Sequence, residues 1–366
     1  MKRLLFFLAL CLPAFGAYAN HVQITVAHGM VSGGSDLTDK AVGIKACGDQ
    51  FKSGGHIQHS AVFNGQIVPA DFVYSPNSDG TSPYKYEHVY WDQAGGCVYS
   101  WVKNPTLSHT NDWVFYAAYN DASVTTYQGG SVGDVWAATY VAVYHFAPKG
   151  DGSVSLVDST SHGNTWTNSG GVEAAGPMGG AASFDTSSYM SVAGTGLSLH
   201  YANMTVEAWA NSTTQGNNIV DKWGGTYNYA LTLNTAGHPW WVTAEDGTPY
   251  IQTGTATLSP SSTLHQIDGV KAGGGQALYV DGASDSTLGC GSGTVDTSSD
   301  AAYIGQWNGG TGSAGVVAEM RFISTNLSAG EIATNYNNLA NYATYVTQGA
   351  EQGGGGGARH KVVISN

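Results

Sequence analysis

The sequence predicts an all-β protein made of two tandem β-sandwich domains, with one short helix near the C-terminus. Only 11% of the 366 residues are charged, while 51 are glycine and 21 are tyrosine. This composition suits short strands joined by tight turns better than long solvated helices. Many short segments alternate in polarity at period two, and turn residues separate them at fairly regular intervals, which is typical of sandwiches and jelly rolls.

The first unit contains the clearest hairpin. In residues 84–92 and in residues 97–103, successive side chains alternate between the two faces of a predicted strand. Ala94-Gly95-Gly96 lies between the two segments as a turn. The next segment, 113–119, is apolar on both faces, so we expect a central strand there.

The second unit is predicted to hold a longer series of strands and the one helix. The expected strands are 141–146, 181–184, 189–192, 204–210, 229–234, 240–244, 267–272, 276–280, 301–304 and 315–323. Ser328-Ala329-Gly330-Glu331 is a capping box, which predicts a helix start. Ile332, Tyr336 and Leu339 then share one helical face.

Residues 1–19 have the pattern of a secretory signal peptide. Lys2 and Arg3 precede an apolar run over 4–12, and Ala17-Tyr18-Ala19 is a cleavage site. The run is too short for a comfortable membrane span, so we expect export without a transmembrane segment after cleavage. The location is then extracellular, cell-surface or periplasmic. The expected divisions are the signal peptide 1–19, a first β-sandwich domain 20–139, a jelly roll 140–352 and a Gly-rich flexible tail 353–366.

The net charge of the expected mature protein disfavours one class of binding partner. Removing Lys2 and Arg3 leaves 11 basic and 26 acidic residues, a net charge of −15. Such a protein repels phosphate backbones, so nucleic acid is not an expected partner.

Export permits a disulfide, and Cys47 and Cys97 are the natural pair because they lie in the same half. Three buried thiols are the equally weighted alternative.

The second half resembles a bacterial laminin-G-like, concanavalin A-like jelly roll. The motifs that carry the resemblance run in family order: Tyr144-His145-Phe146, Gly180 to Asp185, Met204 to Trp209, Leu278-Tyr279-Val280-Asp281-Gly282, Glu319 to Phe322 and Leu327 to Ile332. The first half is similar to a poorly characterised bacterial domain that often precedes such jelly rolls, through Trp91-Asp92, the 98–103 and 115–120 segments and Trp136. The resemblance implies an exported protein that recognises sugars or proteins.

Two family positions differ in this chain. An acidic pair is replaced by Ala318-Glu319, and a Trp-His pair by Leu264-His265. These changes put in question any calcium site that depends on them. Asp185 and Asp281 remain as candidate calcium ligands, and the alternative is that both carboxylates cap turns.

We expect no catalytic residue. Related glucanases place E-x-D-x-x-E on one strand, so that carboxylates flank the scissile bond, and that triplet is absent. Glu207 is the only acidic residue of its predicted strand, and Glu245-Asp246 would point to opposite faces.

Aromatic residues near polar, Gly-rich turns are the remaining functional signal. Sugar rings have apolar C–H faces, and an exposed indole offers them a flat surface and an N–H donor. The candidates are Trp223, Tyr227, Tyr229, Trp240, Trp241 and Trp307. Because Trp240 and Trp241 are consecutive, only one of them can face outward from a strand.

We therefore expect an exported carbohydrate-binding or adhesive module without catalysis of its own, whose partner is a glycan or a cell-surface protein. One alternative is a structural or protein-interaction component of a cell-envelope assembly. Another is a glycoside hydrolase or lyase that uses Glu207, Glu245 or Glu319.

Overall fold

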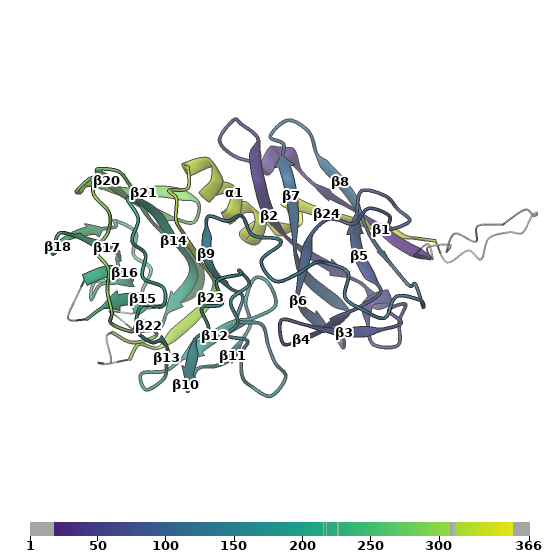
Figure 1. Ribbon diagram of the computed structural model, residues 1–366, viewed down its shortest axis with the longest axis horizontal. Coiled ribbons are helices and arrows are strands. Elements are labelled where there is room, and N and C mark those ends of the chain that lie inside the picture. The colour runs from purple at the N-terminus through teal and green to yellow at the C-terminus, as the bar shows by residue number, and fades with distance from the viewer. Residues whose placement is uncertain are drawn as a thin grey trace, which may run out of the picture.

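The computed structural model describes residues 18–214, 216, 218–224, 227–307, 310 and 312–353. The predicted signal peptide therefore lies outside the described residues except for Tyr18 and Ala19, and the predicted tail lies outside except for Gly353. Strands make up most of the regular structure in the described chain, and two α-helices lie near its C-terminal end, so the all-β prediction is confirmed (Figure 1). None of the described helices is long and apolar enough to cross a membrane.

The second unit is a jelly roll of two large antiparallel sheets. The seven-stranded sheet has the order β10 (Thr167–Ser169), β13 (Tyr189–Val192), β22 (Ala302–Ile304), β15 (Asn218–Trp223), β16 (Tyr227–Leu233), β17 (Pro239–Glu245) and β18 (Thr248–Thr253). The eight-stranded sheet has the order β11 (Val172–Ala174), β12 (Ala181–Phe184), β23 (Gly315–Ile323), β14 (Asn203–Ser212), β19 (Ser261–Ala272), β20 (Gly275–Val280) and β21 (Ala283–Gly289), and β9 (Tyr140–Tyr144) pairs with β23.

The core of the jelly roll lies between these sheets. Alternate residues of each strand point inward, as the period-two pattern requires. Met190, Leu231 and Trp241 come from the seven-stranded sheet, and Val206 and Phe322 from the eight-stranded sheet, and all are buried. The opposite face of each sheet remains available for other contacts.

The first unit is a smaller sandwich. One sheet has the order β24 (Val346–Gly353), β1 (Asn20–Val26), β8 (Trp113–Tyr119) and β5 (Phe72–Ser75). The other has β2 (Leu37–Cys47), β7 (Cys97–Leu107) and β6 (Tyr86–Asp92), and a hairpin of β3 (Ser60–Phe63) and β4 (Gln66–Pro69) lies beside them. The predicted hairpin is thus β6–β7, and the predicted central strand is β8, which pairs with β1 and β5.

The C-terminal segment returns to the first unit. After the jelly roll the chain forms α1 (Ala329–Ala340), α2 (Tyr342–Tyr345) and β24, which pairs with β1 from Val26↔Val346 to Asn20↔Gly353 (Figure 1). The expected jelly-roll range, 140–352, therefore includes a strand that belongs to the sheet of the first unit. The capping box at Ser328 and Glu331 is present as predicted.

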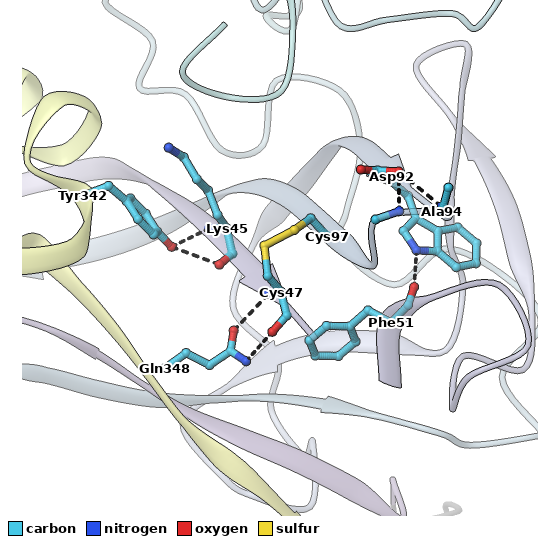
Figure 2. Close-up of a disulfide and its surroundings, with 10 residues drawn as sticks. Lys45, Cys47, Phe51, Asp92, Ala94, Cys97, Tyr342 and Gln348 are labelled. Carbon is cyan, nitrogen blue, oxygen red and sulfur yellow. Dashed lines mark hydrogen bonds between the residues drawn. A yellow bond between two sulfur atoms is a disulfide. The ribbon is translucent and has the colours of Figure 1, made fainter. Parts of the chain in front are cut away.

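Side chains of this segment cover the free edge of β2. Asn338 accepts from the Gly43 N–H and donates to its carbonyl, at 2.7 and 2.9 Å. Tyr342 does the same for Lys45, and Gln348 for Cys47 (Figure 2). An edge strand left open is a template for unwanted pairing, and here alternate backbone groups are satisfied by side chains instead.

Cys47 and Cys97 form a disulfide across the paired strands β2 and β7 (Figure 2). Cys290, in the second unit, is a free thiol. We expect the exported protein to gain two daltons in intact mass on treatment with a reductant, because one bond takes up two hydrogens. An unchanged mass would show that both residues are thiols.

A buried ionic network joins the two units. His145 lies between two carboxylates, with Nδ1 2.8 Å from Glu319 in β23 and Nε2 2.9 Å from Glu87 in β6. Arg321 Nη1 donates to Glu207 Oε1 at 2.6 Å, and its guanidinium carbon lies 4.5 Å from the ring centroid of Trp101. The network fixes the outer face of the eight-stranded sheet against the first unit.

This network sets the charge of its histidine. Burial alone would lower the pKa of His145, but the Glu319 and Glu87 carboxylates outweigh burial and raise the pKa to about 9. The imidazolium therefore bridges two carboxylates at neutral pH. The network consequently holds two cations, Arg321 and His145, among the carboxylates of Glu87, Glu207 and Glu319.

Candidate functional site

Three of the six predicted aromatic side chains gather at one end of the seven-stranded sheet. The ring centroids of Trp223 and Tyr227 are 4.2 Å apart, and those of Trp223 and Trp307 are 6.2 Å apart. Tyr227 and Trp307 are 37% and 40% exposed, which is unusual for such large rings. We call Trp223, Tyr227 and Trp307 the aromatic cluster.

The fold explains how the cluster forms. Trp223 ends β15 and Tyr227 begins β16, and these residues pair across the antiparallel ladder after a bulge between Lys222 and Trp223. Trp307 follows β22, the strand on the other side of β15. Three consecutive strands of one sheet therefore bring the rings together, although Trp307 is distant in sequence.

Two of the predicted aromatic residues cannot contact a ligand. Tyr229 and Trp241 are fully buried, with ring centroids 6.5 Å apart in the core of the jelly roll. Both lie on the inward face of their strands, β16 and β17, so strand alternation assigns them to packing. The expectation that they bind a ligand was wrong. Trp240, next to Trp241, points away from the core and is half-buried.

A carboxylate lies against Gly224, the residue that follows Trp223. A Cβ atom on Gly224 would be 2.4 Å from the carboxylate carbon of Asp300, so only glycine leaves room for this approach. Ser298 Oγ donates to Asp300 Oδ2 at 3.1 Å. Because Gly224 directly follows Trp223, the carboxylate lies against the end of the strand that carries the Trp223 ring, and it can accept hydrogen bonds from hydroxyl groups.

A buried ammonium group holds the backbone behind the cluster. Lys222 Nζ donates to the carbonyls of Gly194, Gly196 and Asp300 at 2.7, 2.9 and 2.7 Å. Burial lowers the pKa of Lys222 to about 8, because its effect exceeds that of the Asp300 charge, which raises the pKa. The ammonium form therefore still predominates at neutral pH.

Sequence reasoning missed a second aromatic pair on the same sheet. The rings of Tyr189 and Tyr303 are 6.0 Å apart, and both side chains are half-buried. Their neighbours Met190 and Ile304 point into the core, so the tyrosines point away from it. The alternation of 189–192 and 302–304 could have revealed them. Tyr303 pairs with Asp221, two residues before Trp223.

The two carboxylates expected as calcium ligands bind other groups of the chain: Asp185 binds within its own turn, and Asp281 binds residues of β19. Asp185 Oδ1 accepts from the N–H and the hydroxyl of Ser187, both at 2.8 Å. Asp281 accepts from the Gln266 N–H and lies 2.8 Å from His265 Nδ1. Within the described ranges, no group of three or more His, Cys, Asp or Glu residues could hold a metal ion. Asp185 and Asp281 are each engaged by groups of the chain itself, and we derive no role for calcium.

The carboxylates considered for catalysis are buried and paired. Glu207 binds Arg321 and accepts from Asn335 Nδ2 at 2.6 Å, and Glu319 binds His145. Both are fully buried. Glu245 lies 3.1 Å from Lys271 Nζ and is 6% exposed. A substrate bond therefore cannot reach any of these three groups in this structure.

A hollow of about 580 Å³ lies elsewhere, on the outer face of the eight-stranded sheet. It is bordered by β20, β21 and the start of α1, and its lining includes Val270, Ala277, Tyr279, Leu288 and Leu327. No charged side chain lines it, and Tyr279 is its single aromatic residue. It lacks the paired rings and carboxylate of the aromatic cluster.

The comparison with protein families fits this architecture. Residues 184–333 match the family model of the concanavalin A-like lectin/glucanases superfamily. The resemblance found in the sequence is thereby confirmed for this part of the chain, which contains Trp223, Tyr227 and Trp307. No curated protein matches the chain.

Several solved structures are similar to the chain. The binding domain of Paraclostridial Mosquitocidal Protein 1 is 11% identical with a TM-score of 0.44, covering 54% of this chain and 52% of that one. The botulinum neurotoxin serotype G binding domain has the same identity and score, covering 54% and 50%. This chain thus spans about half the length of these two. Domain 4 of AbnA, a GH43 extracellular arabinanase from Geobacillus stearothermophilus solved with arabinotriose, is 16% identical with a TM-score of 0.44, covering 54% and 98%.

Proposed function

We propose that this protein is an exported glycan-binding module without catalysis of its own, and that the aromatic cluster is its sugar-binding surface. The observation that carries the proposal is the group of three adjacent rings, two of them well exposed. The Asp300 carboxylate lies against Gly224, the residue that follows Trp223. The cluster lies in the part of the chain that matches a lectin and glucanase superfamily.

The chemistry of the cluster suits a sugar. The C–H face of a pyranose or furanose ring packs on an indole or phenol ring, while the indole N–H and a carboxylate bind its hydroxyl groups. The expected mature charge of −15 disfavours acidic polysaccharides, because like charges repel at the approach. We therefore propose neutral glycans as the ligand class.

The absence of catalysis is supported by the position of the acidic groups. Hydrolysis of a glycosidic bond normally needs two carboxylates on either side of that bond. Glu207, Glu245 and Glu319 are each buried against a cation. The signal-peptide pattern and the Cys47–Cys97 disulfide support export, since disulfides persist in oxidising compartments.

Truncating the cluster tests the proposal. We expect Trp307→Ala and Trp223→Ala each to weaken binding to the best ligand of a neutral-glycan array by about tenfold or more, which is about 1.4 kcal/mol. Isothermal titration calorimetry measures the loss. Trp307→Ala should leave the melting temperature nearly unchanged, because its ring is 40% exposed.

Tyr116→Ala is the matched control, since this tyrosine is half-buried on β8 of the first unit, away from the jelly roll. It should retain wild-type affinity. Equal affinity of the wild type and both tryptophan variants would contradict the site. An array without any bound glycan would contradict the function.

A further inference from the structure

Lys222 has a solvation environment that is unusual for a lysine. It lies on β15 and is fully buried, although it is not paired directly with a carboxylate. Within the described part of the chain its acceptors are three backbone carbonyls from two separate segments, residues 194–196 and residue 300. An ammonium group has three N–H donors, so each donor has one acceptor.

Backbone carbonyls that converge in this way commonly bind a metal cation such as calcium. Here the cation is supplied by a side chain of the strand itself. A buried charge is costly unless it is fully hydrogen-bonded, so the arrangement persists only while all three carbonyls stay in place. Lys222 therefore holds both segments against β15.

The segment that contains Asp300 connects this contact to the aromatic cluster. The Asp300 carbonyl binds the ammonium, and the Asp300 carboxylate lies against Gly224. Trp223 lies between Lys222 and Gly224 in the chain. Asp300 thus contacts the residues on either side of Trp223 in the chain, Lys222 through its carbonyl and Gly224 through its carboxylate.

We propose that Lys222 is a positioning residue for the aromatic cluster, in which its ammonium acts as an internal cation that fixes Asp300 and Trp223 for sugar binding. The inference rests on the proposed function for its ligand. The placement of the rings by Lys222 can also be tested without any sugar.

The chain offers a matched control in Lys271, a second buried ammonium group. Its Nζ lies 3.0 to 3.2 Å from the carbonyl oxygens of Ala202, Gly273, Gly291 and Gly293, and 3.1 Å from Glu245 Oε1. Both lysines therefore contact the same two stretches of chain, 194–202 and 291–300, but at different positions. Lys222 contacts residues 194–196 and 300, whereas Lys271 contacts residues 202 and 291–293. Its loss should destabilise the fold without displacing the cluster.

The first experiment compares Lys222→Met with Lys271→Met. Both variants keep an apolar stem and lose the charge. We expect the Lys222 variant to bind the glycan at least tenfold more weakly and to shift the indole N–H resonances of Trp223 and Trp307. The Lys271 variant should melt at a lower temperature but keep both the affinity and the two indole resonances.

The second experiment is chemical rescue of Lys222→Ala. Propylammonium can replace the missing stem and donate three hydrogen bonds, whereas tetramethylammonium has no N–H group. We expect propylammonium to restore the two indole resonances and the affinity, and tetramethylammonium at the same concentration to restore neither. If the alanine variant does not fold without the amine, folding that depends on propylammonium gives the same answer.

The outcomes separate this inference from the proposed function. Unchanged indole resonances in Lys222→Met, or equal rescue by both ammonium ions, would overturn the role of Lys222. If the wild type binds no glycan, the proposed function and the sugar-directed part of the inference both fail. If the indole resonances shift in Lys222→Met in that case, the conclusion that Lys222 positions the rings still holds.

Discussion

Arg321→Met is expected to lower the free energy of unfolding by about 3–5 kcal/mol, because breaking a buried ion pair leaves an uncompensated charge in the interior. Arg321 is 2% exposed and binds Glu207 at 2.6 Å, and Glu319 lies 3.7 Å from its Nη2. Without the guanidinium, both carboxylates stay buried between the units. Urea unfolding followed by circular dichroism measures the change.

Lys103→Met provides the comparison. Lys103 lies 3.7 Å from Asp39, and the two side chains are 25% and 60% exposed, so water screens the pair. Exposed ion pairs contribute about 0–1 kcal/mol, and we expect a loss within that range. If Arg321→Met costs no more than Lys103→Met, the interface does not depend on its buried charges.

Raising the pH from 6.5 to 9 is expected to lower the free energy of unfolding by up to about 3 kcal/mol through the deprotonation of His145. This figure follows because each unit of pKa shift corresponds to about 1.4 kcal/mol. The pKa of His145 in the folded protein is raised from 6.5 to about 9. The folded state therefore keeps a proton that the unfolded state releases across this range. The contribution is complete below pH 6.5 and disappears as the pH passes 9.

His145→Gln isolates this contribution. Glutamine can still hydrogen-bond Glu87 and Glu319 but carries no titrating charge, so its free energy of unfolding should vary less between pH 6.5 and 9. Lys222 makes the free energy of unfolding rise with pH above pH 8, because its pKa of about 8 in the folded state is below the unfolded value. This contribution is the same in the wild type and in His145→Gln, so it cancels in the comparison. Parallel pH profiles for wild type and variant would show that His145 is not the bridging cation.

Local patterns predicted much of this fold. Period-two alternation located the β6–β7 hairpin, and the Ser328 and Glu331 capping box located the start of α1, because both signals arise from neighbouring residues. The pairing of β1 with β24 could not be predicted in this way. It joins Asn20 to Gly353, and strand pairing at that separation depends on tertiary packing rather than on local sequence.

The candidate site was predicted in part for the same reason. Trp223, Tyr227 and Trp307 were selected for their polar, Gly-rich surroundings, but their meeting depends on the order β22-β15-β16. Alternation required one of Trp240 and Trp241 to be buried without saying which, since register decides that. The roles of Lys222 and Asp300 depend on contacts between loops, and no spacing in the sequence indicates them.

The most direct test of the central claim is a crystal structure of the wild-type chain with the oligosaccharide that binds it best on the array. A sugar ring packed on Trp223, Tyr227 or Trp307, with a hydroxyl group bound to Asp300, is the predicted result. A sugar bound in the hollow beside β20 and α1, or anywhere on the first unit, would contradict the claim.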